Sequence, residues 1–159
     1  MSGEPTGRYL AFELGGQCFA VEVSKVEVVL ESVPITRVPK APEHLRGVIN
    51  YRGAVIPVAD LGIRFGAGKT PSGEGTSIIV LQVRLGREDL TIGVLADSVR
   101  EVIDLDPAKI ETPPRVGTSA MDGLIEGIAE CNGEFVIVLN IDEAFKAEGL
   151  AVEQAVEAS

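Results

Sequence analysis

The chain has 159 residues, long enough to bury a substantial core, and with 45% hydrophobic but only 4% aromatic residues that core must be aliphatic. Eighteen glycines and nine prolines favour many short strands with tight turns over a helical bundle. The net charge of −10 argues against DNA, RNA or an anionic membrane as the principal partner.

The cysteines and the first residues indicate the compartment. Cys18 and Cys131 lie within strand patterns and are too few for a disulfide framework, which favours a reducing cytoplasm. The segment Met1–Pro5 lacks the basic start and apolar run of a signal peptide, and no apolar stretch approaches membrane-spanning length. We therefore expect a soluble cytoplasmic protein that does not insert into the membrane.

Alternating apolar and polar residues, bounded by glycine or proline, predict two groups of short strands. The predicted strands of the first group are 9–14, 19–23, 28–31, 35–38 and a pair within 47–59. Those of the second group are 77–85, 90–95, 99–105, 124–131 and 134–139. Each group has about five strands, and closing each into a small barrel would leave few open edges.

Capping residues and glycine-rich stretches predict the connections. Short helical turns are expected at 24–27, 60–65 and 140–146, where Ser, Asp or Asn stands in the capping position. The stretch 66–76 is expected to be a flexible linker between a first barrel (8–65) and a second barrel (77–147). This division leaves open an exchange of strands between the halves. Residues 106–123 are expected to form a long loop, and 1–7 and 151–159 flexible tails.

Two alignments of the chain with itself support a duplicated unit. Residues 47–61 align without a gap with 127–141, and both copies contain two strands around an Xaa-Gly turn. Residues 19–29 align with 92–102, so that Val26 matches Val99. Two matches in the same order suggest two similar β modules in one chain. The boundary between such modules is a common place for partners or ligands.

Motifs for catalysis, nucleotides or metals are weak. Gly66–Thr70 resembles a phosphate-binding loop, but Ile63 stands where the first glycine is required and no helix pattern follows. The single histidine, His44, has no second ligand at metal-binding spacing. Acidic residues within 104–111 could form an acid–base pair or bind calcium, although their spacing matches no calcium loop. We expect no cofactor, no metal and no catalytic residues.

Two features point instead to protein binding. Arg52 occupies a hairpin turn whose repeat partner is Asn132, so the turn itself does not require arginine. The guanidinium is either simply solvated or contacts a partner, a role to which arginine is well suited. Val26, Val28 and Val29 cannot all point inward on a regular strand, so we expect Val28 to be exposed within an apolar groove.

Three segments resemble the CheW family of bacterial chemotaxis coupling proteins. Phe19–Val29 is similar to the opening of these proteins. Arg46–Leu61 contains N-x-R-G followed by V-I-P-V-x-D-L, which resembles the family's most recognisable motif. Gly93–Val102 resembles the D-x-V-x-E-V segment of the second half, and Asn140–Ile141 fits the last strand-to-helix step. The resemblance covers about 8–147.

The resemblance implies an all-β fold of two SH3-like five-stranded barrels packed side by side, with short helices including one near the C-terminus. It also implies an adaptor without enzymatic activity. Members bind the cytoplasmic tip of methyl-accepting chemoreceptors and the regulatory domain of the histidine kinase CheA, in arrays under the inner membrane.

The resemblance also implies which residues of this chain contact partners. Those that match receptor or kinase contacts are Val26, Gly47 and Arg52, and those that match the second-half wall of the receptor groove are Val94, Val99 and Val102. Val28 stands where many members have glutamate, which bears on partner choice near Arg52.

Alternative interpretations remain open at this point. The chain could serve a non-flagellar chemosensory pathway, such as pilus motility or development, or correspond to the CheW-like part of a CheV-type protein. A different class is a small-molecule-binding or enzymatic β-barrel that uses the acidic loops.

Overall fold

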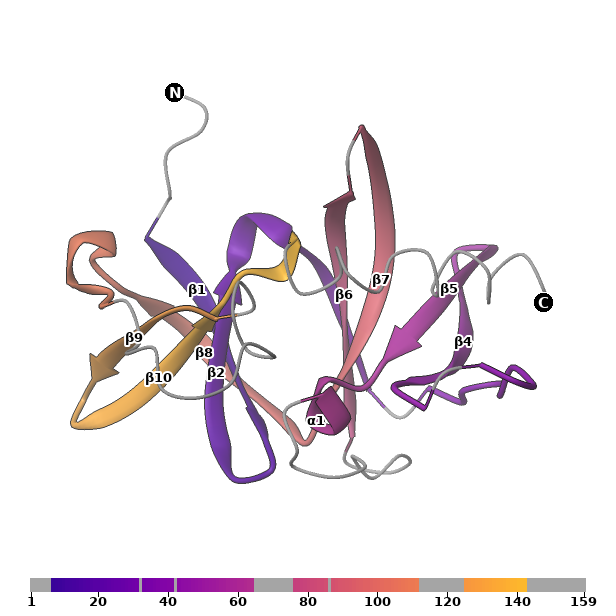
Figure 1. The fold of residues 1–159 in the computed structure, drawn as a ribbon, viewed down its shortest axis with the longest axis horizontal. Coiled ribbons are helices and arrows are strands. Elements are labelled where there is room, and N and C mark those ends of the chain that lie inside the picture. Colours follow the sequence, from indigo (N-terminus) through magenta and orange to yellow (C-terminus); the bar gives the residue numbers. More distant parts are fainter. Residues whose placement is uncertain are drawn as a thin grey trace.

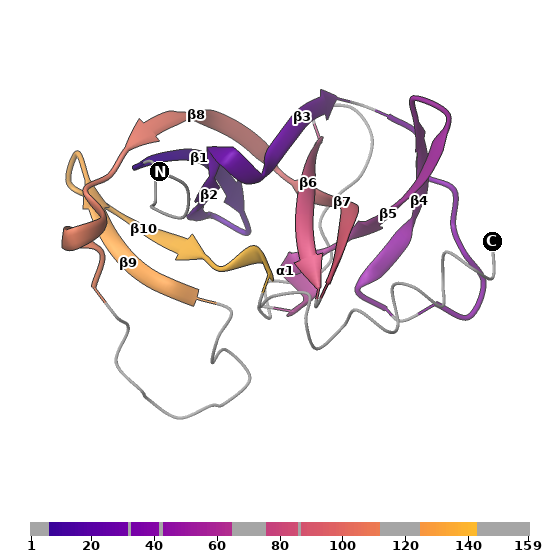
Figure 2. The ribbon, with the colours of Figure 1, turned by 90° about the horizontal axis from the view of Figure 1, so that it is seen from above.

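The computed structural model describes residues 7–31, 33–41, 43–64, 76–85, 87–111 and 125–142. These residues form two five-stranded sheets that lie side by side (Figures 1 and 2). The expected all-β fold with two five-stranded units is confirmed. The expected linker 66–75, most of the long loop, the end of the last helix beyond 142 and the tails lie outside the described residues.

Each sheet has the same internal arrangement. In order across the sheet, the first contains β8 (Ser98–Asp104), β1 (Arg8–Leu14), β2 (Gln17–Glu22), β10 (Glu134–Leu139) and β9 (Ile125–Cys131). The second contains β3 (Val26–Glu31), β6 (Ser77–Leu85), β7 (Glu88–Ala96), β5 (Ala54–Ala59) and β4 (Leu45–Tyr51). Neighbours are antiparallel, except that β10 is parallel to β2 and β5 is parallel to β7.

Neither sheet corresponds to one predicted half of the chain. β1 and β2 pair with β8, β9 and β10, whereas β3 crosses to the other sheet. β5 and β6, which flank the expected linker, belong to one sheet, so a division at 66–76 does not separate the two sheets. Alternation along the chain locates strands but contains no information about which distant strand each will pair with. Each sheet combines strands that precede and strands that follow residues 66–76.

The two self-alignments of the chain correspond to equivalent places in the two sheets. The β4–β5 hairpin matches the β9–β10 hairpin, and the β2–β3 step matches the β7–β8 step. The strand registers agree as well, since Phe12 pairs with Phe19 as Leu81 pairs with Ile92. Most residues of one sheet can therefore be compared with a counterpart in the other.

Three apolar clusters hold the molecule together. One, which we call the junction core, fills the space between the sheets and contains Leu10, Phe12, Leu14, Phe19, Val21, Ala59, Leu61, Ile79, Leu81, Val83, Ile92, Val94, Ala96, Leu139 and Ile141. The first sheet covers a cluster of its own around Val136 and Val138, and the second covers another around Val58 and Val80. The junction is thus packed with side chains, and only its margins can face a partner.

Two hairpins turn in the left-handed conformation that favours glycine and asparagine. The backbone φ angles are 55° and 82° at Arg52 and Gly53, and 52° and 81° at Asn132 and Gly133. Both are the paired left-handed turns that fit the twist of a two-residue hairpin. Asn50 accepts a hydrogen bond from the Gly53 amide at 3.1 Å. Arginine is not the residue that such a turn prefers, so its presence at 52 needs another reason.

The short helices agree only in part with the prediction. The turn expected at 24–27 is a 3-10 helix, Val23–Lys25, that follows Glu22 without a side-chain cap, so a capping box at Ser24 is wrong. The helix α1 (Leu61–Arg64) begins after Asp60, whose carboxylate accepts from the Gly62 amide at 3.0 Å, as predicted.

A further 3-10 helix, Pro107–Lys109, lies in the expected long loop. The strand expected at 35–38 is reduced to one bridge between Thr36 and Val48.

Candidate functional site

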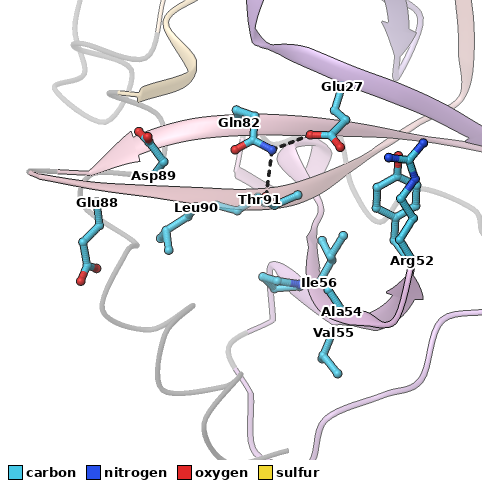
Figure 3. A pocket seen from close by; sticks show the side chains of 13 residues that line it. Glu27, Arg52, Ala54, Val55, Ile56, Gln82, Glu88, Asp89, Leu90 and Thr91 are labelled. Carbon is cyan, nitrogen blue, oxygen red and sulfur yellow. Dashed lines mark hydrogen bonds between the residues drawn. The ribbon is translucent and has the colours of Figure 1, made fainter.

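A groove opens in the second sheet where two parallel strands separate. β5 and β7 pair only at Val58–Gly93 and Ala59–Val94, and towards their N-terminal ends they leave a cavity of about 650 Å³. Figure 3 shows this space, which we call the Arg52 groove. It is lined by Glu27, Tyr51, Arg52, Gln82 and the segments 54–57 and 88–92. The groove exists because the parallel pairing of β5 and β7 is only two residue pairs long, so the rest of the two strands diverge.

One wall of the Arg52 groove carries a guanidinium. Arg52 is exposed, and its Cζ lies 5.3 Å from the centroid of the Tyr51 ring, a cation–π distance. No ion pair within the described part of the chain involves Arg52. The adjacent Val55 is 51% exposed, although the next residue, Ile56, is buried. A charged group and an exposed aliphatic side chain therefore stand together at the end of the β4–β5 hairpin.

Carboxylates also line the groove. The Gln82 amide donates to the Glu27 carboxylate at 2.6 Å and to the Thr91 hydroxyl at 2.9 Å. Glu27 reaches the groove because the register of β3 shifts between Val26 and Val28, which is a bulge. Glu88 and Asp89 lie at the tip of the β6–β7 hairpin, across the groove from Arg52 (Figure 3). Positive and negative charge are therefore separated across an apolar floor.

A second apolar surface lies at the margin of the junction core, and we call it the valine rim. It consists of Val26 and Val29 on β3 and Val99 and Val102 on β8. Their cross-strand partners, all in the junction core, are Leu81, Ile79, Phe12 and Leu10. Residues directly opposite on antiparallel strands share a face, so all four valines point towards the junction. Three of them are half-buried, and Val102 is 53% exposed.

The remaining expected residues lie behind these surfaces. Val94 is fully buried in the junction core, so it can support the valine rim but cannot touch a partner directly. The expected exposure of Val28 is wrong, because the bulge at Glu27 places Val28 opposite Val80 and against the core of the second sheet. Gly47 is buried at φ +148°, where a side chain would collide with the Thr36 carbonyl. Its glycine is explained by this close backbone approach.

The place in the first sheet that corresponds to the Arg52 groove is a smaller pocket of about 260 Å³. There Arg100 donates to Glu134 at 3.0 Å and to the Cys18 sulfur at 3.6 Å, and its Nε lies 3.7 Å from the Glu13 carboxylate. Burial raises the pKa of the Cys18 thiol, although the Arg100 guanidinium acts in the opposite direction. We call this the Arg100 pocket.

Sequence reasoning missed two exposed hydrophobic residues. Val55 and Phe135, which is 65% exposed, occupy the same position in the two aligned hairpins. Each precedes a buried residue, Ile56 or Val136, so strand alternation already indicates that they face solvent.

The described residues contain neither a metal-binding cluster nor a membrane-spanning helix. Among them, no group of three or more His, Cys, Asp or Glu side chains is placed to bind a metal ion. No helix in the same residues combines the length and apolar character needed to cross a bilayer.

Comparisons with known proteins agree with the geometry. The model of the CheW-like domain matches residues 8–149. The chemotaxis protein CheW of Thermotoga maritima is 32% identical over 154 residues, covering 92% of this chain and 91% of that protein. Protein FrzA of Myxococcus xanthus is 30% identical over 142 residues, covering 87% and 85%.

A solved structure shares the architecture. The crystal structure of the scaffolding protein TtCheW from Thermoanaerobacter tengcongensis superposes with a TM-score of 0.76 and 33% identity, covering 91% of this chain and 92% of that one. The duplicated sheets, the Arg52 turn motif and these matches lead to one conclusion: the chain belongs to the CheW family of chemotaxis scaffold proteins.

Proposed function

We propose that this protein is a non-catalytic adaptor that couples methyl-accepting chemoreceptors to a CheA-type histidine kinase. The observation that supports this most directly is the presence of two separate apolar surfaces, the Arg52 groove and the valine rim. An adaptor must hold two partners at once, and two such surfaces allow this without competition.

The valine rim suits a helical receptor tip. Aliphatic side chains on two edge strands form a shallow apolar margin, and an antiparallel coiled coil offers aliphatic side chains of its own. Val26 and Val99 are half-buried where the junction core reaches the surface, and Val102 extends the same face into solvent. Val94 lies beneath this margin and keeps the rim in place.

The Arg52 groove suits the regulatory domain of the kinase. The family resemblance implies that this domain has the same double-barrel fold, so it can present a hairpin end to a hairpin end. Arg52 and Val55 offer a cation and an aliphatic contact on the β4–β5 turn. Gly47 and Val28 contribute indirectly, because they fix β4 against Thr36 and β3 against the core of the second sheet.

This function places the protein in the cytoplasm, at receptor arrays under the inner membrane. It would be held there through its partners, since the proposed contacts are with protein surfaces and not with lipid.

Co-sedimentation with a receptor signalling domain and a kinase regulatory domain tests the proposal. Val102→Glu should lose the receptor and keep the kinase, whereas Arg52→Glu should do the reverse. Glu101→Lys, on an exposed neighbour of Val102, serves as the control and should keep both. Full recovery of both variants with both partners would refute the assignment of the two surfaces.

A non-flagellar chemosensory pathway is the alternative that the family resemblance leaves open. It uses the same surfaces and differs in the identity of the partners. A pull-down from the native cytoplasm, with partners identified by mass spectrometry, distinguishes the two pathways. A thermal-shift screen with nucleotides and metal ions tests the small-molecule alternative, because a tight ligand would stabilise the fold.

A further inference from the structure

The β6–β7 hairpin is longer than its counterpart in the first sheet. The β1–β2 hairpin ends at the pair Leu14–Gln17, and the equivalent pair in the second sheet is Val83–Leu90. The second hairpin continues beyond that point with two more pairs, Arg84–Asp89 and Leu85–Glu88. Residues 84–89 therefore have only a two-glycine turn as their counterpart. We call them the hairpin extension, and Figure 1 shows β6 and β7 reaching beyond the neighbouring strands.

The hairpin extension supplies one wall of the Arg52 groove. Glu88 and Asp89 are exposed and line the groove, and Leu90 continues the apolar floor next to them. Asp89 lies 3.9 Å from Arg84, but both side chains are mostly exposed, so the interaction is weak and leaves the carboxylate accessible. Arg52 lines the groove from the β4–β5 hairpin, whereas the Val55 side chain points away from the β6–β7 hairpin (Figure 3).

The base of the hairpin extension is fixed to the rest of the molecule. The backbone amide of Arg84 donates to one carboxylate oxygen of Asp142 at 2.8 Å, and the other oxygen pairs with Lys25 at 2.7 Å. Three elements distant in sequence thus meet at one carboxylate. Because the base of the hairpin extension is fixed, its carboxylates have defined positions and can discriminate between partners by where the partner carries its charges.

We propose that the hairpin extension makes the Arg52 groove selective for one occupant, and this rests on the function proposed above. The occupant is a protein surface with an apolar ridge flanked by a carboxylate on one side and a lysine or arginine on the other. The carboxylate pairs with Arg52, and the cation pairs with Glu88 or with Asp89, whose side chains point to opposite sides of the hairpin (Figure 3). A ridge with two acidic flanks meets repulsion from Glu88 and Asp89, and one with two basic flanks meets repulsion from Arg52.

The test uses the intact protein and a kinase regulatory domain as the probe. The double variant Glu88→Lys/Asp89→Lys should lower the association rate about tenfold in low salt. The difference from wild type should shrink towards about 500 mM salt, where charges are screened beyond about 4 Å. Glu101→Lys/Asp104→Lys, with the same charge change on exposed positions of β8, should bind as wild type does.

A second variant removes the wall without reversing its charge. Replacing 84–89 by Gly-Gly copies the first-sheet turn and should weaken binding while lowering its salt dependence. Melting temperature and circular dichroism of each variant establish that the fold is intact.

The outcomes separate the two proposals. If the wild type binds the kinase domain and neither variant changes this binding, the role of the hairpin extension is overturned and the adaptor function still stands. Absence of binding by the wild type overturns both. A charge-sensitive homodimer, seen by light scattering, would show that a second copy of this chain is the occupant and would also overturn the proposal.

Discussion

The Arg52 groove and the Arg100 pocket occupy equivalent places, yet their volumes differ, at about 650 Å³ and about 260 Å³. Gln82 and Thr91 pair across β6 and β7 as Glu13 and Cys18 pair across β1 and β2. Glu27 in the groove corresponds to an arginine in the pocket. In the groove, Gln82 and Glu27 form a hydrogen bond. In the pocket their counterparts, Glu13 and Arg100, form an ion pair, with the carboxylate on the hairpin and the cation on the neighbouring strand.

The difference lies in side chains, because the backbone framework is the same. Ala54 leaves the groove wide, whereas its counterpart Glu134 binds Arg100 and narrows the pocket. In the pocket the cation is satisfied within the protein, and in the groove Arg52 faces outward. A duplicated fold can therefore support two different surfaces, since binding depends on the residues placed on it.

The largest expected effect concerns a charge pair that only one copy has. Arg46 and Asp60 form a nearly buried ion pair at 2.9 Å, and their counterparts are Glu126 and Asn140. Asp60→Asn removes the negative charge from this nearly buried pair, so it should lower the free energy of unfolding by about 3 kcal/mol in urea titrations. Asp104→Asn, which weakens the exposed pair with Arg8, should cost less than about 1 kcal/mol. Equal losses would contradict the importance of burial.

The next effect tests the close backbone approach at Gly47. A methyl group there would collide with the Thr36 carbonyl, and the φ of +148° is unfavourable for alanine. Gly47→Ala should lower the free energy of unfolding by about 2 kcal/mol or more, measured by chemical denaturation. Gly53→Ala is the control, since no atom lies within 4 Å of its added methyl group and only the cost of φ, about 1 kcal/mol, remains. A larger loss at Gly53 would show that space is not the deciding factor.

A third variant converts the groove towards the Arg100 pocket. Ala54→Glu installs the counterpart of Glu134, and in the groove this carboxylate faces Glu27, the counterpart of Arg100, so it should narrow the groove and add negative charge to it. Kinase-domain binding should weaken about tenfold, roughly 1.4 kcal/mol, with the melting temperature almost unchanged. Ala54→Gln has nearly the same size without the charge, and calorimetry should find a smaller loss. Identical losses would mean that volume, and not charge, closes the groove.

The smallest effect concerns Glu126, the counterpart of Arg46. Partial burial raises the pKa of Glu126, and the nearby Glu22 carboxylate raises it further. The folded protein therefore favours the protonated form, and ionisation at neutral pH opposes folding. Glu126→Gln should raise the melting temperature slightly at pH 7, and the gain should vanish below the ordinary glutamate pKa of about 4.3. Glu130→Gln, on the same strand, is the control, and a gain that persists in acid would contradict this explanation.

Local features of the fold could be predicted from the sequence. Alternation of apolar and polar residues located the strands to within a few residues, because a half-buried strand places every second side chain in the core. The turns at Arg52–Gly53 and Asn132–Gly133 and the cap at Asp60 depend on neighbouring residues alone, and all three are confirmed. The strand expected at 35–38 failed because a short apolar run can pack without a full pairing partner.

Distant pairings and small irregularities could not be predicted. The crossing of β3 to the second sheet depends on contacts between residues far apart in sequence. The bulge at Glu27 turns the Val28 side chain towards the core of the second sheet, and no local sequence pattern predicts a bulge. For the candidate site, comparison of the aligned hairpins singled out Arg52 against Asn132. The same comparison could have identified Val55 and Phe135.

The exchange of strands has a consequence for how this chain acquires its fold during synthesis. The second sheet is complete once Ala96 has left the ribosome, since all its strands lie between β3 and β7. The first sheet must wait for Leu139, because Phe19 on β2 pairs with Ile137 on β10. Its nascent β1–β2 hairpin has no lateral neighbour until β8 is translated, and β2 still lacks its partner β10 after that, a stage at which chaperones would have an exposed apolar substrate.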